Sequence, residues 1–170
     1  MTSNDMGCLT PAGHIADIAP APTPTPARGG TREFVEPRPT GKGPEDWFDG
    51  DVWFDVIHAG QEPSRLRADM VRFAPGARTA WHHHAVGQTL HVVAGIALIG
   101  TRVGTVYEAH PGETVTCPPG EEHWHGATED RFMQHLALWD GTAPDDDRPE
   151  TTWLEKVAEE QCNGPRTRSR

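Results

Sequence analysis

Histidines are concentrated in the middle of the chain, at a spacing that suits metal binding. Eight of the ten histidines lie between positions 82 and 135. His82 and His84 are two residues apart, so on a β-strand both side chains project to one face, where they can bind the same ion, and His83 projects to the other face. His123 and His125 repeat this spacing after a Pro-Pro-Gly turn. Two strands that carry histidines inward predict a divalent metal site.

The elements that must position these histidines are short strands. Glycine and proline account for 18 and 16 of the 170 residues, which argues against a helical bundle and favours many turns. Alternating segments separated by such turn residues predict an all-β sandwich or barrel. The expected strands are 51–57, 68–73, 79–84, 89–93, 96–99, 105–108, 113–117, 123–125 and 132–139.

The two ends of the chain differ in composition from its middle. Residues 1–40 form a Pro/Ala/Thr-rich segment that we expect to be a flexible leader, because it cannot bury enough apolar surface to offset its ordering entropy. The globular domain is predicted to span 41–161, with a single helical turn at 44–48. Thr152 and Glu155 have the spacing of a capping box, which predicts a short C-terminal helix ending near Gln161. Residues 162–170 are expected to be a disordered basic tail.

Net charge and hydropathy exclude several classes of function. The formal net charge is −10, so no broad basic face is available to bind nucleic acid or an anionic membrane. No apolar run reaches the length of about 20 residues that a membrane-spanning helix needs. The first basic residue is Arg28, which does not fit a secretory signal, and we expect a cytoplasmic protein. Cys8, Cys117 and Cys162 are predicted to be reduced, with Cys117 buried.

Two segments carry a resemblance to a known family. Gly76-x5-His82-x-His84-x3-Gln88-x6-Gly95 resembles the first cupin motif, with glutamine in place of its usual glutamate. Gly112-x5-Pro118-x-Gly120-x2-His123 resembles the second. More narrowly, the segments 42–48, 75–81, 87–90, 123–127 and 133–136 resemble the manganese-dependent cupin-type (R)-hydroxynitrile lyases and their uncharacterised bacterial relatives. The likeness covers residues 42–161.

The resemblance implies a cupin double-stranded β-helix, which is a jelly-roll barrel, with a divalent transition metal. The implied metal ligands are His82, His84, Gln88 and His123. The implied ion is manganese, with iron, nickel, cobalt or zinc as alternatives. His125 and His135 match histidines placed beside the metal, and Thr79 matches a pocket hydroxyl. A homodimer is also expected, because small cupins expose sheet edges that a second copy can cover.

The chain departs from these lyases at three positions, which are His83, His91 and Trp139. The first two positions place additional histidines beside the ligand motifs. Trp139 occupies a pocket-facing position where the lyases carry a polar side chain. These differences do not affect the predicted metal ligands, but they leave the substrate of this chain undefined.

Gln88 bears on the chemistry of the predicted site. Three neutral imidazoles and a neutral amide would leave a divalent ion with its full charge, whereas a glutamate would cancel one unit of it. The expected result is stronger Lewis acidity, which favours lyase or isomerase chemistry over oxygen chemistry. In the alternative interpretation, Gln88 only forms hydrogen bonds and the site binds metal weakly or not at all.

A neutral histidine near an ion-bound hydroxyl can accept its proton at physiological pH. His135 is the preferred general base, and His125 would share or orient that step. In the alternative, one of them only donates to a carbonyl beside the site. Trp81 and Trp124 are expected to pack within the barrel wall, and no function is assigned to the histidines at 14, 58 and 110.

Three functions remain open from the sequence. The first is a metal-dependent lyase that acts on a small oxygen-bearing substrate, as the resemblance to hydroxynitrile lyases implies. The second is a dioxygenase or isomerase that uses the same scaffold and an open coordination position. The third is a cupin that binds a small ligand without catalysis. Specificity depends on a few pocket side chains that the shared motifs do not define.

Overall fold

The structure of the protein is a computed structural model that describes residues 34–168. Most of the predicted leader, together with Cys8 and His14, lies outside the described residues, as do Ser169 and Arg170. Within the described part, the only helix is α1 (Glu159–Cys162), and its four residues are too few to cross a membrane.

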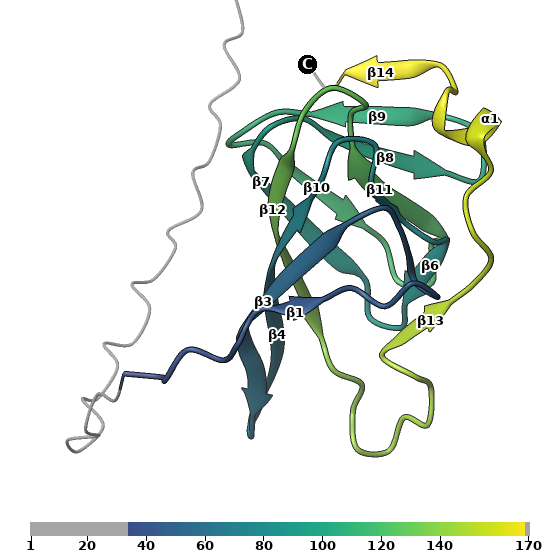
Figure 1. The fold of residues 1–170 in the computed structure, drawn as a ribbon. Helices are drawn as coiled ribbons and strands as arrows, with labels where there is room; N and C mark the ends of the chain where they lie inside the picture. The colour runs from purple at the N-terminus through teal and green to yellow at the C-terminus, as the bar shows by residue number, and fades with distance from the viewer. Residues whose placement is uncertain (1–33, 169–170) are drawn as a thin grey trace, which may run out of the picture. The chain divides into compact units, whose positions relative to one another are not determined.

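Two β-sheets build the domain, and each predicted strand is present in one of them (Figure 1). The first sheet has the strand order β1 (Gly41–Lys42), β3 (Val52–Gln61), β4 (Ser64–Phe73), β12 (Met133–Asp140), β7 (Gln88–Ala94), β10 (Thr114–Cys117). The second has the order β13 (Thr151–Trp153), β6 (His82–His84), β11 (His123–Ala127), β8 (Ala97–Thr101), β9 (Val106–Ala109), β14 (Arg166–Arg168), with β5 (Arg78–Thr79) joining β11 to β2 (Phe48–Asp49). This architecture is a jelly-roll barrel.

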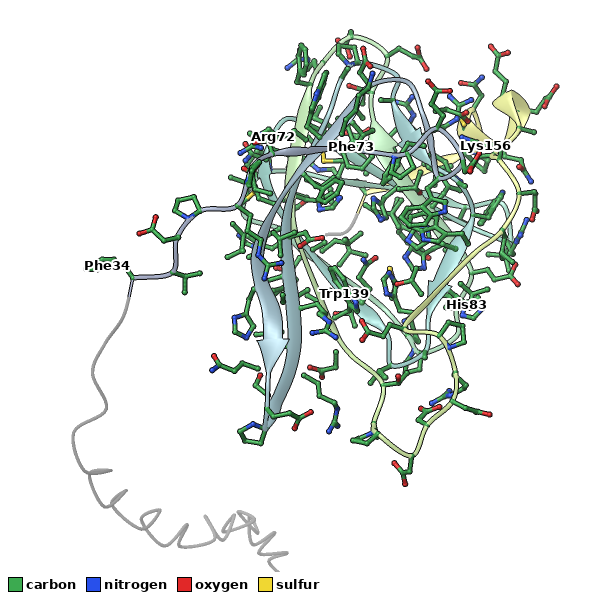
Figure 2. All side chains as sticks on the ribbon, turned by 60° about the horizontal axis from the view of Figure 1, so that its bottom comes forward. Phe34, Arg72, Phe73, His83, Trp139 and Lys156 are labelled. Atoms are coloured by element: carbon green, nitrogen blue, oxygen red, sulfur yellow. The ribbon has the colours of Figure 1, made fainter. Side chains whose placement is uncertain are left out.

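Alternation along the strands separates the interior of the barrel from its outer surface. At the end of β4 the Phe73 ring lies in the interior, and the Arg72 side chain lies on the outer side, where its Nη2 donates to Asp55 at 2.7 Å (Figure 2). Burying apolar surface between the sheets stabilises the fold by about 25 cal/mol per Å². The main core cluster includes Val52, Val71, Phe73, Leu90, Val92, Ile99 and Met133.

A second buried cluster lies apart from this core and contains Trp81 and Trp124 together with Val157. The indole N–H of Trp81 donates to the Gln161 side-chain oxygen at 3.2 Å. The Arg102 guanidinium lies over the Trp81 ring, 4.0 Å from its centre. The expectation that both tryptophans pack within the barrel wall is therefore confirmed.

The helix predicted from Thr152 is wrong for residues 152–158. Residues 151–153 form β13, which pairs with β6, and the backbones of Trp81 and Leu154 continue this pairing through a hydrogen bond of 2.8 Å. The Glu155 carboxylate, which the capping box requires at the helix start, instead pairs with Arg102 at 2.7 Å. Pairing with β6 thus overrides the local capping pattern, and the C-terminal helix is restricted to α1.

Two further predictions concern the helical turn at 44–48 and the tail at 162–170. The Phe48 N–H donates to the Pro44 carbonyl at 3.1 Å, which confirms the helical turn. The expectation of a disordered tail is wrong for Arg166–Arg168, because these residues form β14 parallel to β9. This pairing satisfies backbone groups that an edge strand would otherwise leave open.

The turn between β7 and β8 depends on Gly95. Its φ of +74° is one that side chains rarely adopt, and a Cβ there would collide with the Phe132 carbonyl oxygen. Gly104 has a φ of +84° but has open space around it. We expect Gly104→Ala to lower the free energy of unfolding by about 1–2 kcal/mol, and Gly95→Ala by clearly more, because only the second variant adds a backbone collision. Urea unfolding compares the two, and equal losses would contradict this account of the turn.

Candidate metal centre

Four histidines of the second sheet lie together in the interior of the barrel. β6 carries His82 and His84, and β11 carries His123 and His125, and all four are buried. The antiparallel pairing of these strands sets His82 directly opposite His123, with their ring centroids 4.4 Å apart. The spacing of two residues within each strand therefore brings the histidines together as predicted.

Three of these rings are held by a hydrogen bond at Nδ1. The partners are the Ala80 carbonyl at 3.0 Å for His82, the Thr151 hydroxyl at 3.1 Å for His84 and the Glu121 carbonyl at 2.9 Å for His123. A histidine oriented in this way presents Nε2 to a metal ion. The amide oxygen of Gln88, which enters from β7 of the facing sheet, lies 3.1 Å from Nε2 of His123.

Among the histidines, the group of candidate ligands in the structure contains His125 in place of the predicted His84. One ring nitrogen from each of His82, His123 and His125 lies within 4.8 Å of the others. His84 is outside this group, but its Nε2 is buried without a hydrogen-bond partner in the described structure, as is Nε2 of His125. His125 is thus close enough to His82 and His123 to share an ion with them.

Burial keeps these histidines neutral. It lowers the pKa of His84 to about 3 and, with neighbouring histidines acting in the same direction, holds the pKa of His82 well below its usual range. The pKa of His123 is also lowered by burial. Neutral imidazole is the form that binds metal, so the buried, unpartnered Nε2 of His84 and the held Nδ1 atoms fit a divalent ion.

His125 and His135 form a pair on the inner side of the site. Nε2 of His135, on β12, lies 3.1 Å from Nδ1 of His125, and the backbone N–H of His125 donates to the Thr79 hydroxyl at 3.1 Å. Burial lowers the pKa of both rings, to about 3 for His135. Thr79 and His125 line the adjacent cavity, whereas His135 is fully buried and does not.

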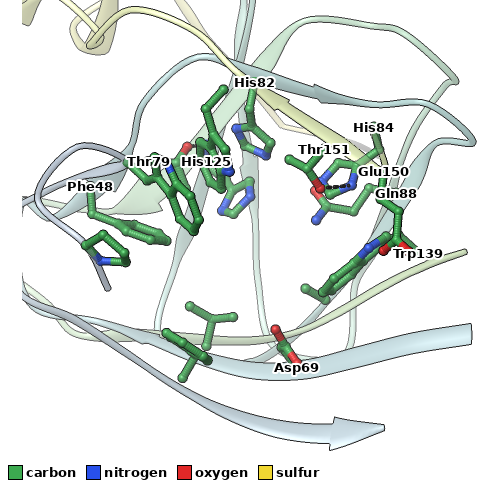
Figure 3. A pocket seen from close by; sticks show the side chains of 16 residues that line it. Phe48, Asp69, Thr79, His82, His84, Gln88, His125, Trp139, Glu150 and Thr151 are labelled. Atoms are coloured by element: carbon green, nitrogen blue, oxygen red, sulfur yellow. Dashed lines mark hydrogen bonds between the residues drawn. The ribbon is translucent and has the colours of Figure 1, made fainter. Parts of the chain in front are cut away.

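The cavity beside the histidines has a volume of about 470 Å³ (Figure 3). Its aromatic walls come from both sheets and from the turn at 44–48. The ring of Trp153 on β13 stacks on Trp47 at 5.0 Å and lies 4.6 Å from the His82 ring. The lining residues are Pro44, Trp47, Phe48, Phe54, Asp69, Val71, Thr79, His82, His84, Gln88, His125, Ala137, Trp139, Glu150, Thr151 and Trp153.

Several of these residues were not predicted from the sequence. Asp69 was not considered, although it alternates with Val71 and Phe73 and so shares their inward face. Thr151 and Trp153 were missed because that segment was expected to be helical. The alternation in β4 could have identified Asp69, whereas no local pattern indicated β13.

Some of the remaining predicted positions lie away from the cavity. His83 and His91 do not line it, and Nδ1 of His91 is 2.9 Å from the Thr114 hydroxyl on β10. Trp139 lines it, as expected for that position. Cys117 is buried as predicted, and burial raises the pKa of its thiol to about 12.

The two sheets and the histidines between them define a cupin barrel, and residues 69–139 match the family described as cupin domain. An (R)-mandelonitrile lyase from Granulicella tundricola is 46% identical to this chain over 125 residues, which cover 72% of this chain and 90% of that protein. The chain therefore belongs to the cupin family, as its motifs predicted.

Solved structures agree with this assignment. A cupin-like protein from Thermotoga maritima is 30% identical with a TM-score of 0.65, and the match covers 78% of this chain and 96% of that chain. A polyketide cyclase from Streptomyces resistomycificus has a TM-score of 0.58 at 16% identity, over 78% of this chain and 92% of that chain. The second likeness concerns the fold alone.

The buried histidines predict how stability depends on pH. A histidine whose folded pKa is lowered leaves the unfolded chain binding more protons, so the metal-free protein should lose stability as the pH falls from about 6.5 toward 3. In this window, each fully buried histidine lowers the free energy of unfolding by about 1.4 kcal/mol for each unit by which the pH falls. Urea unfolding in the presence of a chelator, at pH 7, 6 and 5, measures this slope. We expect His135→Gln to reduce it and His58→Gln, outside the cluster, to leave it unchanged; an unaltered slope in His135→Gln would contradict the explanation.

Proposed function

We propose that this protein is a metal-dependent lyase that breaks or forms a carbon–carbon bond beside an oxygen of a small substrate, with cyanohydrins as the substrate class. The observation that carries the proposal is the set of three histidines held at Nδ1 next to the Gln88 amide; two of them, His82 and His84, line the cavity together with Gln88. The similarity to an (R)-mandelonitrile lyase supports the choice of reaction.

His82, His84, Gln88 and His123 would hold the ion, for which manganese is our first choice and iron, nickel, cobalt or zinc are alternatives. When bound, a divalent ion supplies Lewis acidity that polarises a substrate oxygen. All four side chains are neutral, because burial keeps the imidazoles unprotonated and Gln88 carries no charge. The residues therefore leave the charge of the ion uncompensated, which favours polarisation of oxygen over oxidation of the metal.

In this proposal His125 accepts the proton of the substrate hydroxyl. Its Nε2 is buried and unpartnered, and it can accept a proton only when Nδ1 carries the ring hydrogen, which then donates to Nε2 of His135. His135 therefore acts as a positioning residue that selects the tautomer of His125. The preference for His135 as the base, drawn from the sequence, is replaced because His135 does not line the cavity. Thr79 fixes the backbone of His125 through its hydroxyl.

Metal binding provides the first test. We expect one divalent ion per chain in the reconstituted wild type, and loss of nearly all of it in a variant that combines His82→Ala with His123→Ala, because two of four ligands are removed. His84→Ala should also lose metal, whereas His125→Ala should keep it. His91→Ala is the control. Elemental analysis after dialysis measures the stoichiometry, and equal metal in the double variant and the wild type would refute the site.

Turnover provides the second test, with (R)-mandelonitrile as the substrate and all proteins at equal metal content. We expect His125→Ala to lose activity by about 10²- to 10⁴-fold, the usual effect of removing a general base. His135→Ala should also be impaired, and His135→Gln should recover part of the loss because its amide can still accept the hydrogen bond from His125. Full activity in His125→Ala would remove its assigned role. Oxygen consumption by the wild type, without cyanohydrin cleavage, would favour a dioxygenase instead.

A further inference from the structure

Asp69 is the one carboxyl group on the cavity wall that has no partner among the described residues. It forms no hydrogen bond or ion pair there, although it is half-buried on β4. Glu150, the other lining carboxylate, is bound by two nitrogens of Arg67 at 3.1 and 2.7 Å, which holds its pKa below the usual range. Asp69 is therefore the carboxylate of the cavity wall whose negative charge no described side chain compensates by an ion pair.

The surroundings of Asp69 are apolar and aromatic. Five aromatic rings line the cavity, and no lysine or arginine does. Burial raises the pKa of Asp69 to about 6, and the charge of Arg38 acts in the opposite direction. Asp69 is thus largely ionised at neutral pH while poorly solvated, and a cation that enters the cavity would stabilise it. The aromatic residues are Trp47, Phe48, Phe54, Trp139 and Trp153.

Asp69 lies across the cavity from the histidines. β4 belongs to the first sheet and the strands with His82 and His125 belong to the second, and Figure 3 shows the Asp69 carboxylate on the side opposite to Thr79 and His125. A substrate whose oxygen reaches His125 would therefore extend its other end toward Asp69. Carboxylates and aromatic faces both attract organic cations.

We propose that Asp69 determines specificity, by binding a protonated amine or other organic cation at the non-reacting end of the substrate. This inference rests on the proposed function, since it names the class of substrate for the same site. We therefore expect cyanohydrins with a cationic group to be preferred over neutral ones such as mandelonitrile, because a cation compensates the carboxylate and a neutral ring does not.

The test compares two probes of equal size by isothermal titration calorimetry on the full-length, manganese-reconstituted protein. The cationic probe is 4-(aminomethyl)benzyl alcohol and its neutral counterpart is 4-ethylbenzyl alcohol. We expect the wild type to bind the cationic probe about 10- to 100-fold more tightly, the effect of a hydrogen bond to a charged group. Asp69→Asn should abolish this preference. Asp55→Asn, which removes a carboxylate from the neighbouring strand outside the cavity, should retain it.

Equal affinity of the wild type for both probes, or a preference that survives in Asp69→Asn, would overturn the inference. Asp69→Ala serves as a second variant should the asparagine variant fold poorly, and circular dichroism verifies folding. The outcome is independent of the lyase assignment. Cleavage of mandelonitrile without a cation preference would leave the proposed function in place and reject the role of Asp69. A cation preference that depends on Asp69, without lyase activity, would support the role of Asp69 and reject the proposed function.

Discussion

The pairing of β6 with β11 determines the geometry on which the rest of the site depends. Its register places His82 opposite His123, and the period of two along each strand then brings His84 and His125 to the same interior. Backbone carbonyls next to the strands hold the two opposed rings at Nδ1. A shift of one residue in this register would turn the two histidines of the shifted strand to the outside, so the strand pairing determines whether a metal site can form.

That constraint carries an energetic cost in the absence of a ligand. Several imidazoles are buried close together, and their mutual repulsion and poor solvation would oppose protonation of any one of them. The fold tolerates the cluster because each ring is neutral and most have one nitrogen engaged. The nitrogens left over are Nε2 of His84, Nε2 of His125 and Nδ1 of His135, which are unsatisfied in the described structure. A divalent ion or a substrate would stabilise the two on His84 and His125, which line the cavity.

The strands and the histidine cluster could be predicted from the sequence because both follow from the alternation of side chains and from glycines at tight turns. β13 could not, because Thr152 and Glu155 match a helix cap and only the distant strand β6 makes the extended form favourable. The proposed exchange of roles between His125 and His135 also required the structure. Both histidines point inward by alternation, and only the packing of the two sheets determines which one reaches the cavity.

The cavity has opposite characters at its two sides, and this polarity constrains what can bind. The neutral histidine nitrogens on the second sheet favour a metal ion and an oxygen-bearing group of the substrate. Asp69 on the first sheet favours a positively charged group of the substrate. A small molecule that satisfies both must carry its oxygen and its cation at opposite ends. Aromatic rings from both sheets line the cavity and would help to fix its orientation. In this proposal the facing of the two sheets, more than any single motif, would select the substrate.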